Sequence, residues 1–240
     1  HGWRSSDTAE LFLDDLRLPP DALLGEEGKG FYYIMSTFQN ERLVVGALAS
    51  GCSARAIELT VDYLRNRQAF GKPIAEHQLI QSKLALMATD IEAARMLVIK
   101  AALLKDRGER SDLESAMAKL FATQACARHT LEAIHIHGGY GYTEEFPAAR
   151  TYRDSRINRI FEGTNEINRL FIPGLLLRRA QRGRFPLVQA ITKVTKELLE
   201  MSPLDEVSGD ELALARALLI NAKKLALFVS GVAYQKYGEK

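Results

Sequence analysis

Residues 80–98 read IQSKLALMATDIEAARMLV, and the spacing of the apolar side chains in this stretch decides the fold. Apolar or small residues recur at alternating steps of four and three, at Ile80, Leu84, Met87, Ile91, Ala94 and Val98. That alternation places them along one stripe of an α-helix, which is the seam that a bundle helix packs against its neighbours. The stretch therefore predicts a long helix in an all-α domain.

The following segment repeats the same spacing, at Leu113, Met117, Leu120, Gln124, Ala127, Leu131 and Ile134. Ser111 is a suitable N-cap for this helix, and Gly138-Gly139 is a suitable C-terminal stop. An earlier helix is expected over residues 31–66, and a later one from near Asn165 to past Leu175. Helices joined by short loops in this way predict an up-down four-helix bundle over residues 28–180.

The two ends of the chain differ from this central pattern. Residues 7–18, DTAELFLDDLRL, are mixed and partly alternating, which is typical of strands, and Pro19-Pro20 then breaks any regular element. Two further helical segments are expected near residues 188–201 and 209–237. We therefore expect three parts, 1–27, 28–180 and 181–240, with the last incomplete, in a chain that is a piece of a larger protein.

The composition argues against several classes of protein. The 240 residues are 47% hydrophobic and carry a formal net charge of +2, without the clustered basic excess of a nucleic-acid-binding protein. No continuous run of about 18 apolar residues predicts a transmembrane segment, and no signal peptide opens the sequence. Cys52 and Cys126 lie far apart within helical patterns, which favours reduced thiols in the cytoplasm or the mitochondrial matrix.

Several familiar cofactor motifs are also missing from the sequence. Gly138-Gly139-Tyr140-Gly141 lacks the spacing of a Rossmann loop, and Gly71-Lys72 lacks the earlier glycine of a Walker A loop. His135 and His137 are two residues apart, so a helix points them to nearly opposite sides. No metal site is predicted, because no Cys or His partner flanks them.

Polar residues instead gather at the ends and breaks of the predicted helices. They are Asn40-Glu41-Arg42, RNRQAFGKPIAEHQ at 65–78, HIHGGYGY at 135–142, and FEGTNE at 161–166. Helix ends carry free N–H groups that hold phosphates, so four such features brought together would form a cofactor cleft. A set of separate loop caps is the alternative, and the helical periodicity does not distinguish the two.

Glu162 raises the same choice for a single side chain. It follows the apolar pair Ile160-Phe161 and precedes a turn at Gly163. A charge beside a turn is usually solvated, whereas a carboxyl group in dry surroundings has a raised pKa and can act as a base. Its immediate neighbours leave both interpretations open.

Five segments in order resemble the C-terminal part of the acyl-CoA dehydrogenases, flavoproteins that desaturate acyl thioesters. They are GWRSSDT, LFLDDLRLPPDALLGEEGKGF, RNRQAFGKPIAEHQ, HGGYGYT and YRDSRINRIFEGTNEI, and together they span nearly all of residues 2–175. In this family an N-terminal helical domain and a middle β domain precede the bundle. The resemblance implies that residues 1–27 end such a β domain and that the isolated chain is inactive.

The resemblance also implies which residues bind FAD. Arg67 matches an arginine that meets the flavin pyrophosphate, as a forked cation suits, with Phe70 beside it and Gln78 following. Gly138 and Gly139 match a loop that touches the FAD of a neighbouring subunit, which implies a homodimer or homotetramer. His135 stands where the family usually has glutamine, and the residues that match a second flavin loop are Thr164, Asn165 and Glu166.

For the chemistry, Glu162 matches the base of most members of the family. It would remove the α-proton of an acyl-CoA while flavin N5 takes the β-hydride, giving a trans-2-enoyl-CoA, and a near-neutral pKa suits that transfer. Isovaleryl and long-chain types carry the base just before an arginine on the first long helix, where this chain has Glu41. Glu162 is the preferred base and Glu41 the alternative. The residues matched to the substrate side are Arg42, Phe161 and Gly163.

The partners follow from the same resemblance. Electrons would pass to an electron-transfer flavoprotein, with an acyl-CoA oxidase or a non-catalytic helical interaction module as the alternatives. The residues beyond Arg178 resemble the extra C-terminal helices of the very-long-chain subclass. Segment 209–237 is amphipathic enough to contact a membrane surface, although burial against the bundle is the preferred interpretation.

Overall fold

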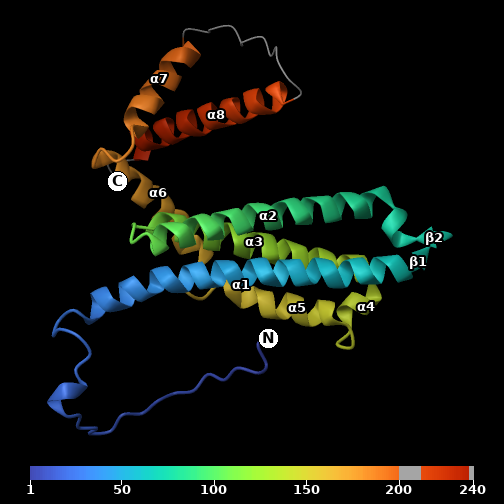
Figure 1. Ribbon diagram of the computed structural model, residues 1–240, viewed down its shortest axis with the longest axis horizontal. Helices are drawn as coiled ribbons and strands as arrows, with labels where there is room; N and C mark the ends of the chain where they lie inside the picture. Colours follow the sequence, from blue (N-terminus) through green and yellow to red (C-terminus); the bar gives the residue numbers. More distant parts are fainter. Residues whose placement is uncertain (200–211, 238–240) are drawn as a thin grey trace. The chain divides into compact units, whose positions relative to one another are not determined.

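The computed structural model describes residues 1–199 and 212–237, which divide into two compact units, His1–Pro173 and Gly174–Lys240. The first unit is helical, as the sequence predicts (Figure 1). Its elements are η1 (Pro20–Ala22), α1 (Gly30–Asn66), β1 (Gln68–Ala69), β2 (Lys72–Pro73), η2 (Ile74–Glu76), α2 (Gln78–Asp106), α3 (Asp112–His137), α4 (Gly139–Tyr142), α5 (Pro147–Ser155), η3 (Arg156–Arg159) and the start of α6 (Asn165–Gln181).

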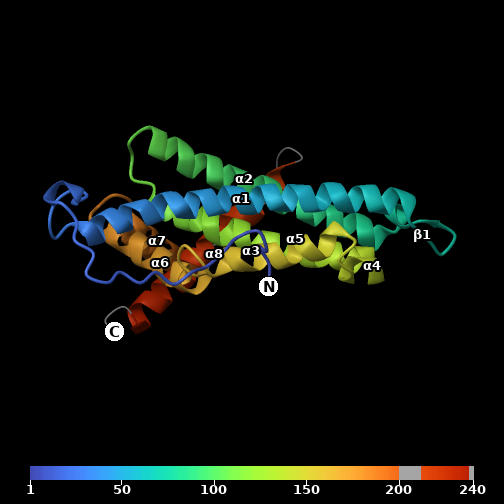
Figure 2. The same cartoon turned by 90° about the horizontal axis from the view of Figure 1, so that it is seen from below.

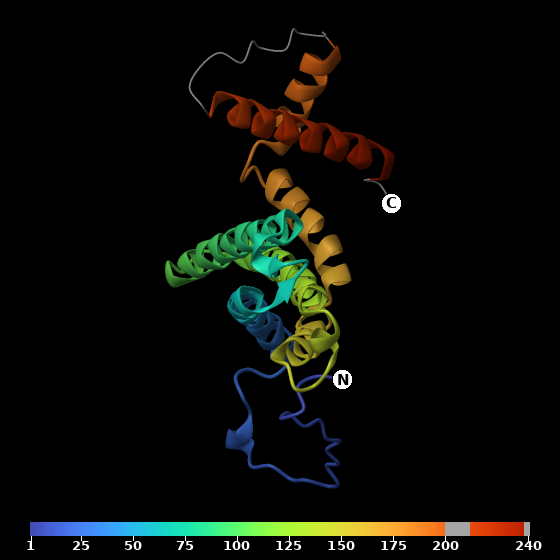
Figure 3. The same ribbon diagram turned by 90° about the vertical axis from the view of Figure 1, so that its right-hand side faces the viewer.

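Helices α1, α2 and α3 pack together in alternating directions, and α5 packs against α1 and α3 in the fourth position (Figure 2). Figure 3 shows the same helices nearly end-on. The sequence analysis expected the fourth helix only from Asn165, where α6 does begin. Helix α5 was missed because its nine residues are too few to show a seam; Pro147 starts it, and Ala148 and Ala149 are buried.

Small side chains fill the centre of this bundle. The core cluster consists of Ala49, Ala94, Ala122 and Cys126, with Cys52 and Phe121 packed against it, and both cysteines are free thiols. Alanine lets two helix backbones approach closely, so α1 and α3 can share a long contact. Gly46 serves the same purpose, because a Cβ atom there would lie 3.5 Å from the backbone of Ala118 on α3 and 3.3 Å from a methyl carbon of Val98 on α2.

The predicted seam is confirmed on α2 and only partly on α3. Met87, Ile91 and Ala94 of α2 are buried. On α3, Met117 is 38% and Leu131 39% exposed, whereas Ala122, Cys126 and their neighbours form the inner face. Helix α3 packs against several other helices, so small residues on more than one side are buried and a single apolar stripe does not describe it. Ser111 is the N-cap residue, without a side-chain cap bond.

A two-residue turn joins β1 to β2 between α1 and α2. Gln68 pairs with Pro73 and Ala69 with Lys72 in antiparallel register. Phe70 and Gly71 form the turn with φ values of 55° and 78°, the left-handed backbone that a tight hairpin requires. The Phe70 side chain is 96% exposed, so the hairpin presents an aromatic ring to its surroundings.

Residues 1–29, all of which the structure describes, form no strand. The strand-rich element expected over residues 7–18 is therefore not observed, because a strand needs neighbouring strands to satisfy its backbone hydrogen bonds. The start of the segment is nevertheless fixed to the bundle. The backbone N–H of Trp3 donates to Asp154 Oδ1 at 2.7 Å, and its indole Nε1 donates to the Asp154 carbonyl at 3.0 Å.

The second unit contains the end of α6 and two helices, α7 (Leu187–Leu199) and α8 (Ala213–Tyr237). Gly231 lets α8 cross α7 closely, since a Cβ there would lie 2.5 Å from Ile191 Cγ2, and Lys224 bonds to Glu197 at 2.9 Å. Both helices were expected, although the predicted boundaries at 201 and 209 lie outside the described residues.

Two helices in the described residues are long and apolar enough on average to span a membrane, namely Gly30–Asn66 and Ala213–Lys236. The sequence criterion of an uninterrupted apolar run did not select them. Helix α1 buries one face, including Ser53 and Thr60, against the bundle, which is also how the core helix of a bundle behaves. Helix α8 exposes most of its apolar side chains, including Leu214, Leu218 and Leu225.

Candidate active site

The loop between η3 and α6 carries Glu162 in an uncommon backbone conformation. Glu162 has φ 55° and Gly163 has φ 83°, so two successive residues are left-handed. Glycine adopts this region freely, but a glutamate there is strained, and such strain is concentrated at functional sites. Phe161 steadies the start of the loop through an edge-to-face contact with Trp3, with ring centroids 5.6 Å apart.

Glu162 lies beside the second candidate base, Glu41 of α1. The hydrogen bond with the Glu41 carboxyl group, burial and the charge of Glu41 raise the pKa of Glu162, in that order, against a smaller opposing effect of Lys119 and Arg42. The Glu41 oxygen Oε2 is buried without a hydrogen-bond partner in the described residues. From the sequence, dry surroundings or a neighbouring Glu41 would each raise the pKa of Glu162, and in the structure the second carboxyl group is the first cause and burial the second.

Arg42, next to Glu41 on α1, faces the same loop. Its guanidinium carbon lies 4.7 Å from the centroid of the Phe171 ring. Gly163 allows the close approach, because a Cβ atom there would lie 3.4 Å from Nε and from one terminal nitrogen of Arg42. Burial lowers the pKa of Arg42, and Asp112 and Glu162 oppose that effect. A cation, two carboxyl groups and a glycine turn thus meet at one point.

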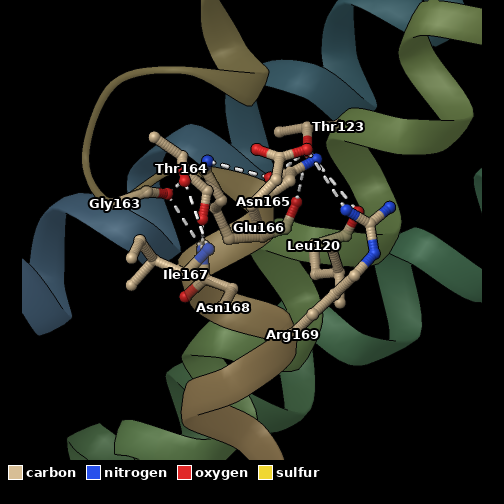
Figure 4. Close-up of polar contacts among 10 residues, drawn as sticks. Leu120, Thr123, Gly163, Thr164, Asn165, Glu166, Ile167, Asn168 and Arg169 are labelled. Atoms are coloured by element: carbon tan, nitrogen blue, oxygen red, sulfur yellow. Dashed lines mark hydrogen bonds and ion pairs between the residues drawn. The ribbon is translucent and has the colours of Figure 1, made fainter.

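Beneath the loop lies a buried polar network (Figure 4). The Asn165 amide donates to Thr123 Oγ1 at 2.9 Å, and the Asn168 amide donates to the Gly163 carbonyl at 3.0 Å. Thr164 Oγ1 accepts from the Ile167 N–H at 3.1 Å and so caps α6. Since Asn165 is 0% exposed, Thr164 and Glu166 are the residues of the predicted flavin loop that a ligand can reach.

Other predicted flavin residues gather at the opposite ends of α1 and α3. Arg67, Gly138 and Gly139 line a pocket of about 490 Å³ with Tyr63, Ala69, Ile74, Ile136, His137, Tyr140 and Thr143. Tyr63 stacks on His137 with ring centroids 4.2 Å apart, and the Arg67 guanidinium lies 5.7 Å from the Tyr140 ring centroid. The pocket therefore offers one cation, aromatic faces and a loop whose glycines leave the backbone accessible.

Three predicted flavin residues do not belong to the lining of this pocket. Phe70 is exposed at the tip of the hairpin, and Gln78 is the exposed first residue of α2. His135 is exposed as well, with its Nδ1 3.8 Å from Glu132 Oε2. Within the described residues, no group of three or more histidine, cysteine, aspartate or glutamate side chains could hold a metal ion.

The two groups of predicted flavin residues are far apart within one chain. Glu41, which neighbours the Glu162 loop, belongs to α1, and Arg67 is the residue that follows the last turn of this helix; the 26 positions between them correspond to roughly 39 Å along a helix. That distance exceeds the length of a flavin dinucleotide. A single flavin would therefore not reach both Arg67 and the Glu162 loop of one chain.

Sequence reasoning missed Lys119 and Asn168, which hold the loop from below. Both side chains are 0% exposed. The sequence did carry a signal for Lys119, which stands among alanines, serine and threonine in SAMAKLFAT. A lysine on the alanine-rich inner face of a helix needs a partner for its charge, whereas a lysine that faces solvent does not. The partner could not be identified from the pattern.

Gly163→Ala tests the loop geometry. A side chain at φ 83° costs about 1–2 kcal/mol, and the added methyl group would also displace Arg42. We expect a lower unfolding free energy of the intact protein, measured by chemical denaturation. Gly51→Ala is the matched control: it lies within α1 with nothing inside 4 Å of the new Cβ. There alanine should stabilise by up to about 1 kcal/mol. Equal effects of the two substitutions would contradict this geometry.

The loop thus combines a carboxyl group of raised pKa, a strained backbone and a neighbouring arginine on an all-α bundle, a combination suited to a general base. The family model described as "Acyl-CoA dehydrogenase, C-terminal domain" matches residues 28–174. The chain belongs to the acyl-CoA dehydrogenase family.

Individual relatives agree with this assignment. The chain is 48% identical to the human mitochondrial short-chain specific acyl-CoA dehydrogenase over 177 residues, 74% of this chain and 43% of the relative. It is 44% identical to the cyclohexane-1-carbonyl-CoA dehydrogenase of Geobacter metallireducens over 179 residues, 75% of this chain and 47% of that relative. The chain thus spans less than half the length of these relatives.

A solved structure extends the similarity into the second unit. The acyl-CoA dehydrogenase from Bacillus anthracis, crystallised with FAD, matches 94% of this chain and 42% of its own, with 41% identity and a TM-score of 0.85. The expected relation to the very-long-chain subclass finds no support, because the named relatives are of short-chain and cyclohexane-carbonyl type.

Proposed function

We propose that the intact protein carrying this chain removes two hydrogens from an acyl-CoA thioester to give the trans-2-enoyl-CoA. The observation that supports this most directly is the position of Glu162. It lies in the family's matching segment, with a raised pKa, beside Glu41 and Arg42. A base for a weakly acidic α-proton works best with a pKa near the working pH, and a raised glutamate moves toward that range.

Each side chain then has a defined task. Glu162, in its ionised form, takes the α-proton of the bound thioester. Phe161 and Gly163 shape the wall of the substrate site on either side of it, and Gly163 gives Arg42 room beside that wall. The Arg42 cation favours the ionised form of Glu162 and would stabilise negative charge that develops on the substrate. Glu41 provides the second carboxyl group that brings the pKa of Glu162 upward.

FAD is the proposed cofactor, and it supplies the acceptor for the β-hydride. The pocket at Arg67 fits part of this group: a guanidinium suits the pyrophosphate, and exposed glycine backbone with aromatic faces suits an adenosine. Phe70 and Gln78 stand at its edge, with His135 in the place of the family's usual glutamine. Thr164 and Glu166 are the proposed flavin contacts of the loop that carries Glu162.

We further propose a homodimer or homotetramer. Arg67 lies roughly 39 Å along the direction of α1 from Glu41, the neighbour of Glu162, so one copy would supply Arg67, Gly138 and Gly139 to the flavin beside the Glu162 of another copy. Sedimentation velocity should then detect the oligomer. A flavin-loaded monomer would contradict this proposal.

The remaining assignments are proposals by the same family relation. Residues 1–27 would end a β domain that covers the exposed first turns of α1, where Phe31 and Tyr32 are 66% and 67% exposed. Residues 28–180 would form the bundle domain and 181–240 the additional helical region, whereas the compact units of the structure divide at Pro173. We place the protein in the cytoplasm or mitochondrial matrix, with electron-transfer flavoprotein as the electron acceptor. The apolar residues of α8 leave a peripheral membrane contact as the alternative to burial.

One experiment tests the function. The intact protein should be purified with yellow flavin absorption, and anaerobic addition of acyl-CoA should bleach it. A series from butyryl- to palmitoyl-CoA would give the preferred chain length. Hydrogen peroxide formed in air at the turnover rate would instead identify an acyl-CoA oxidase. A colourless protein that acyl-CoA leaves unchanged would reject the enzyme assignment and favour an interaction module.

A further inference from the structure

Lys119 has the largest fully buried side chain in the described part of the chain. It stands on α3 with 0% exposure, among Ala116, Ala118 and Ala122. Burying an ammonium group is costly unless the charge has partners. Burial lowers the pKa of Lys119 to about 8, so the protein keeps this group at an energetic disadvantage. The catalytic scheme above assigns it no role.

The partners of Lys119 are all parts of the Glu162 loop. Its Nζ donates to the Gly163 carbonyl at 2.8 Å and to Asn165 Oδ1 at 3.0 Å. Figure 4 shows how close these acceptors lie to each other at the start of α6. The bonds join α3 to Gly163, the second residue of the left-handed pair, and to Asn165, the first residue of α6, and so fix the backbone that follows Glu162.

The electrostatic surroundings connect Lys119 to the same loop. The charged groups that face it are Arg42 of α1, Arg159 of η3, Glu162 of the loop and Glu166 of α6. The two arginines lower the pKa of Lys119 and the two glutamates raise it. In return, the Lys119 charge lowers the pKa of Glu162 and so opposes the effect of Glu41.

We infer that Lys119 is the positioning residue of the proposed base: its ammonium group fixes the Gly163 backbone, and its charge keeps Glu162 ionised beside Glu41. The effect of Lys119 on the ionisation of the base rests on the proposed function. The fixing of the loop backbone rests only on the hydrogen bonds to Gly163 and Asn165.

Removing Lys119 should leave the fold intact, because neither acceptor loses its last donor. The Gly163 carbonyl keeps the Asn168 amide at 3.0 Å, and Asn165 Oδ1 gains the Thr123 hydroxyl at 3.2 Å when that hydroxyl turns from the Lys119 backbone carbonyl 2.8 Å away. Methionine has a similar length and no charge to desolvate. Lys119→Met therefore removes one anchor and one charge without leaving an unsatisfied acceptor.

The test compares wild type, Lys119→Met and a control in the intact flavoprotein. The control is Lys100→Met, which removes the charge of an exposed lysine of α2. The ratio of Lys119→Met turnover to wild-type turnover should be at least about threefold lower at pH 6 than at pH 8. The reason is that loss of a nearby cation favours the protonated, inactive form of Glu162. The control should follow the wild-type pH profile.

Amide hydrogen exchange provides a readout that needs no turnover. In Lys119→Met, amides of residues 163–168 should exchange roughly tenfold or more faster, as expected for the loss of a charge-assisted hydrogen bond, while α2 amides exchange as in wild type. Lys119→Gln separates the two roles. It keeps a donor but no charge, so it should show the altered pH profile with slower loop exchange than Lys119→Met.

The outcomes distinguish this inference from the proposed function. An unchanged pH profile together with unchanged loop exchange in both variants overturns the role of Lys119. Faster loop exchange in Lys119→Met, together with a wild-type protein that acyl-CoA does not bleach, would support positioning and reject the function. If Lys119→Met does not fold, the pH profile and loop exchange of Lys119→Gln decide.

Discussion

Glu162→Gln should reduce turnover of acyl-CoA by roughly 10³-fold, within the range that a positioned base contributes. The substitution keeps the size and a hydrogen-bonding end but removes the only group proposed to take the α-proton. Flavin content should change little, because the substitution leaves the pocket at Arg67 and the loop residues Thr164 and Glu166 unaltered. Anaerobic stopped-flow reduction of the flavin measures the chemical step directly.

Glu41→Gln is the matched control on the other carboxyl group of the pair. We expect only a severalfold change in maximal turnover but a clear change in its pH dependence. Glu162 acts as a base only when ionised, so activity is lost as the pH falls through its raised pKa. Removing the Glu41 carboxylate lowers that pKa, and the acid limb of the profile should move to lower pH. Loss of turnover in Glu41→Gln alone would assign the base to Glu41.

Arg67→Ala should produce protein that retains little flavin. A charge-assisted bond to a phosphate contributes about 1.5–3 kcal/mol, so affinity for FAD should fall roughly 10- to 150-fold. The substitution also removes the cation that lies over the Tyr140 ring in the pocket. The ratio of flavin absorbance to protein absorbance after dialysis, followed by titration with FAD, gives the change in affinity.

Arg65→Ala provides the control for this prediction. Arg65 is exposed in the last turn of α1, two residues before Arg67, and it does not belong to the pocket lining in the described chain. It removes the same charge from nearly the same place. Equal loss of flavin in both variants would indicate a general electrostatic effect and contradict a specific contact at Arg67.

Local patterns in the sequence predicted most of the helical framework. The alternation at Met87, Ile91 and Ala94 gave the buried face of α2, and Asn165 was recognised as the start of α6. These features depend on neighbours within one or two helical turns, which a single sequence displays directly. Helix α5 escaped because nine residues and a proline start give too short a pattern.

The candidate site was predicted unevenly. Motif matching brought forward Glu162, Glu41 and Arg42, and the structure places all three at one loop. It did not separate the flavin residues into two groups along α1, because motif order carries no distance. Phe70 and its turn illustrate the limit: FGKP predicted a break between helices, but the left-handed backbone and the exposed ring appear only in the folded hairpin.

The sequence by itself determined that this protein is an all-α bundle and which carboxyl groups could serve as a base. Only the tertiary structure decided that Glu41 shifts the pKa of Glu162 and that Lys119 holds the loop between them. Helical periodicity is a property of adjacent residues, whereas Glu41, Lys119 and Glu162 are brought together from three distant parts of the chain. A pKa depends on distance and burial, and these exist only once the helices have packed.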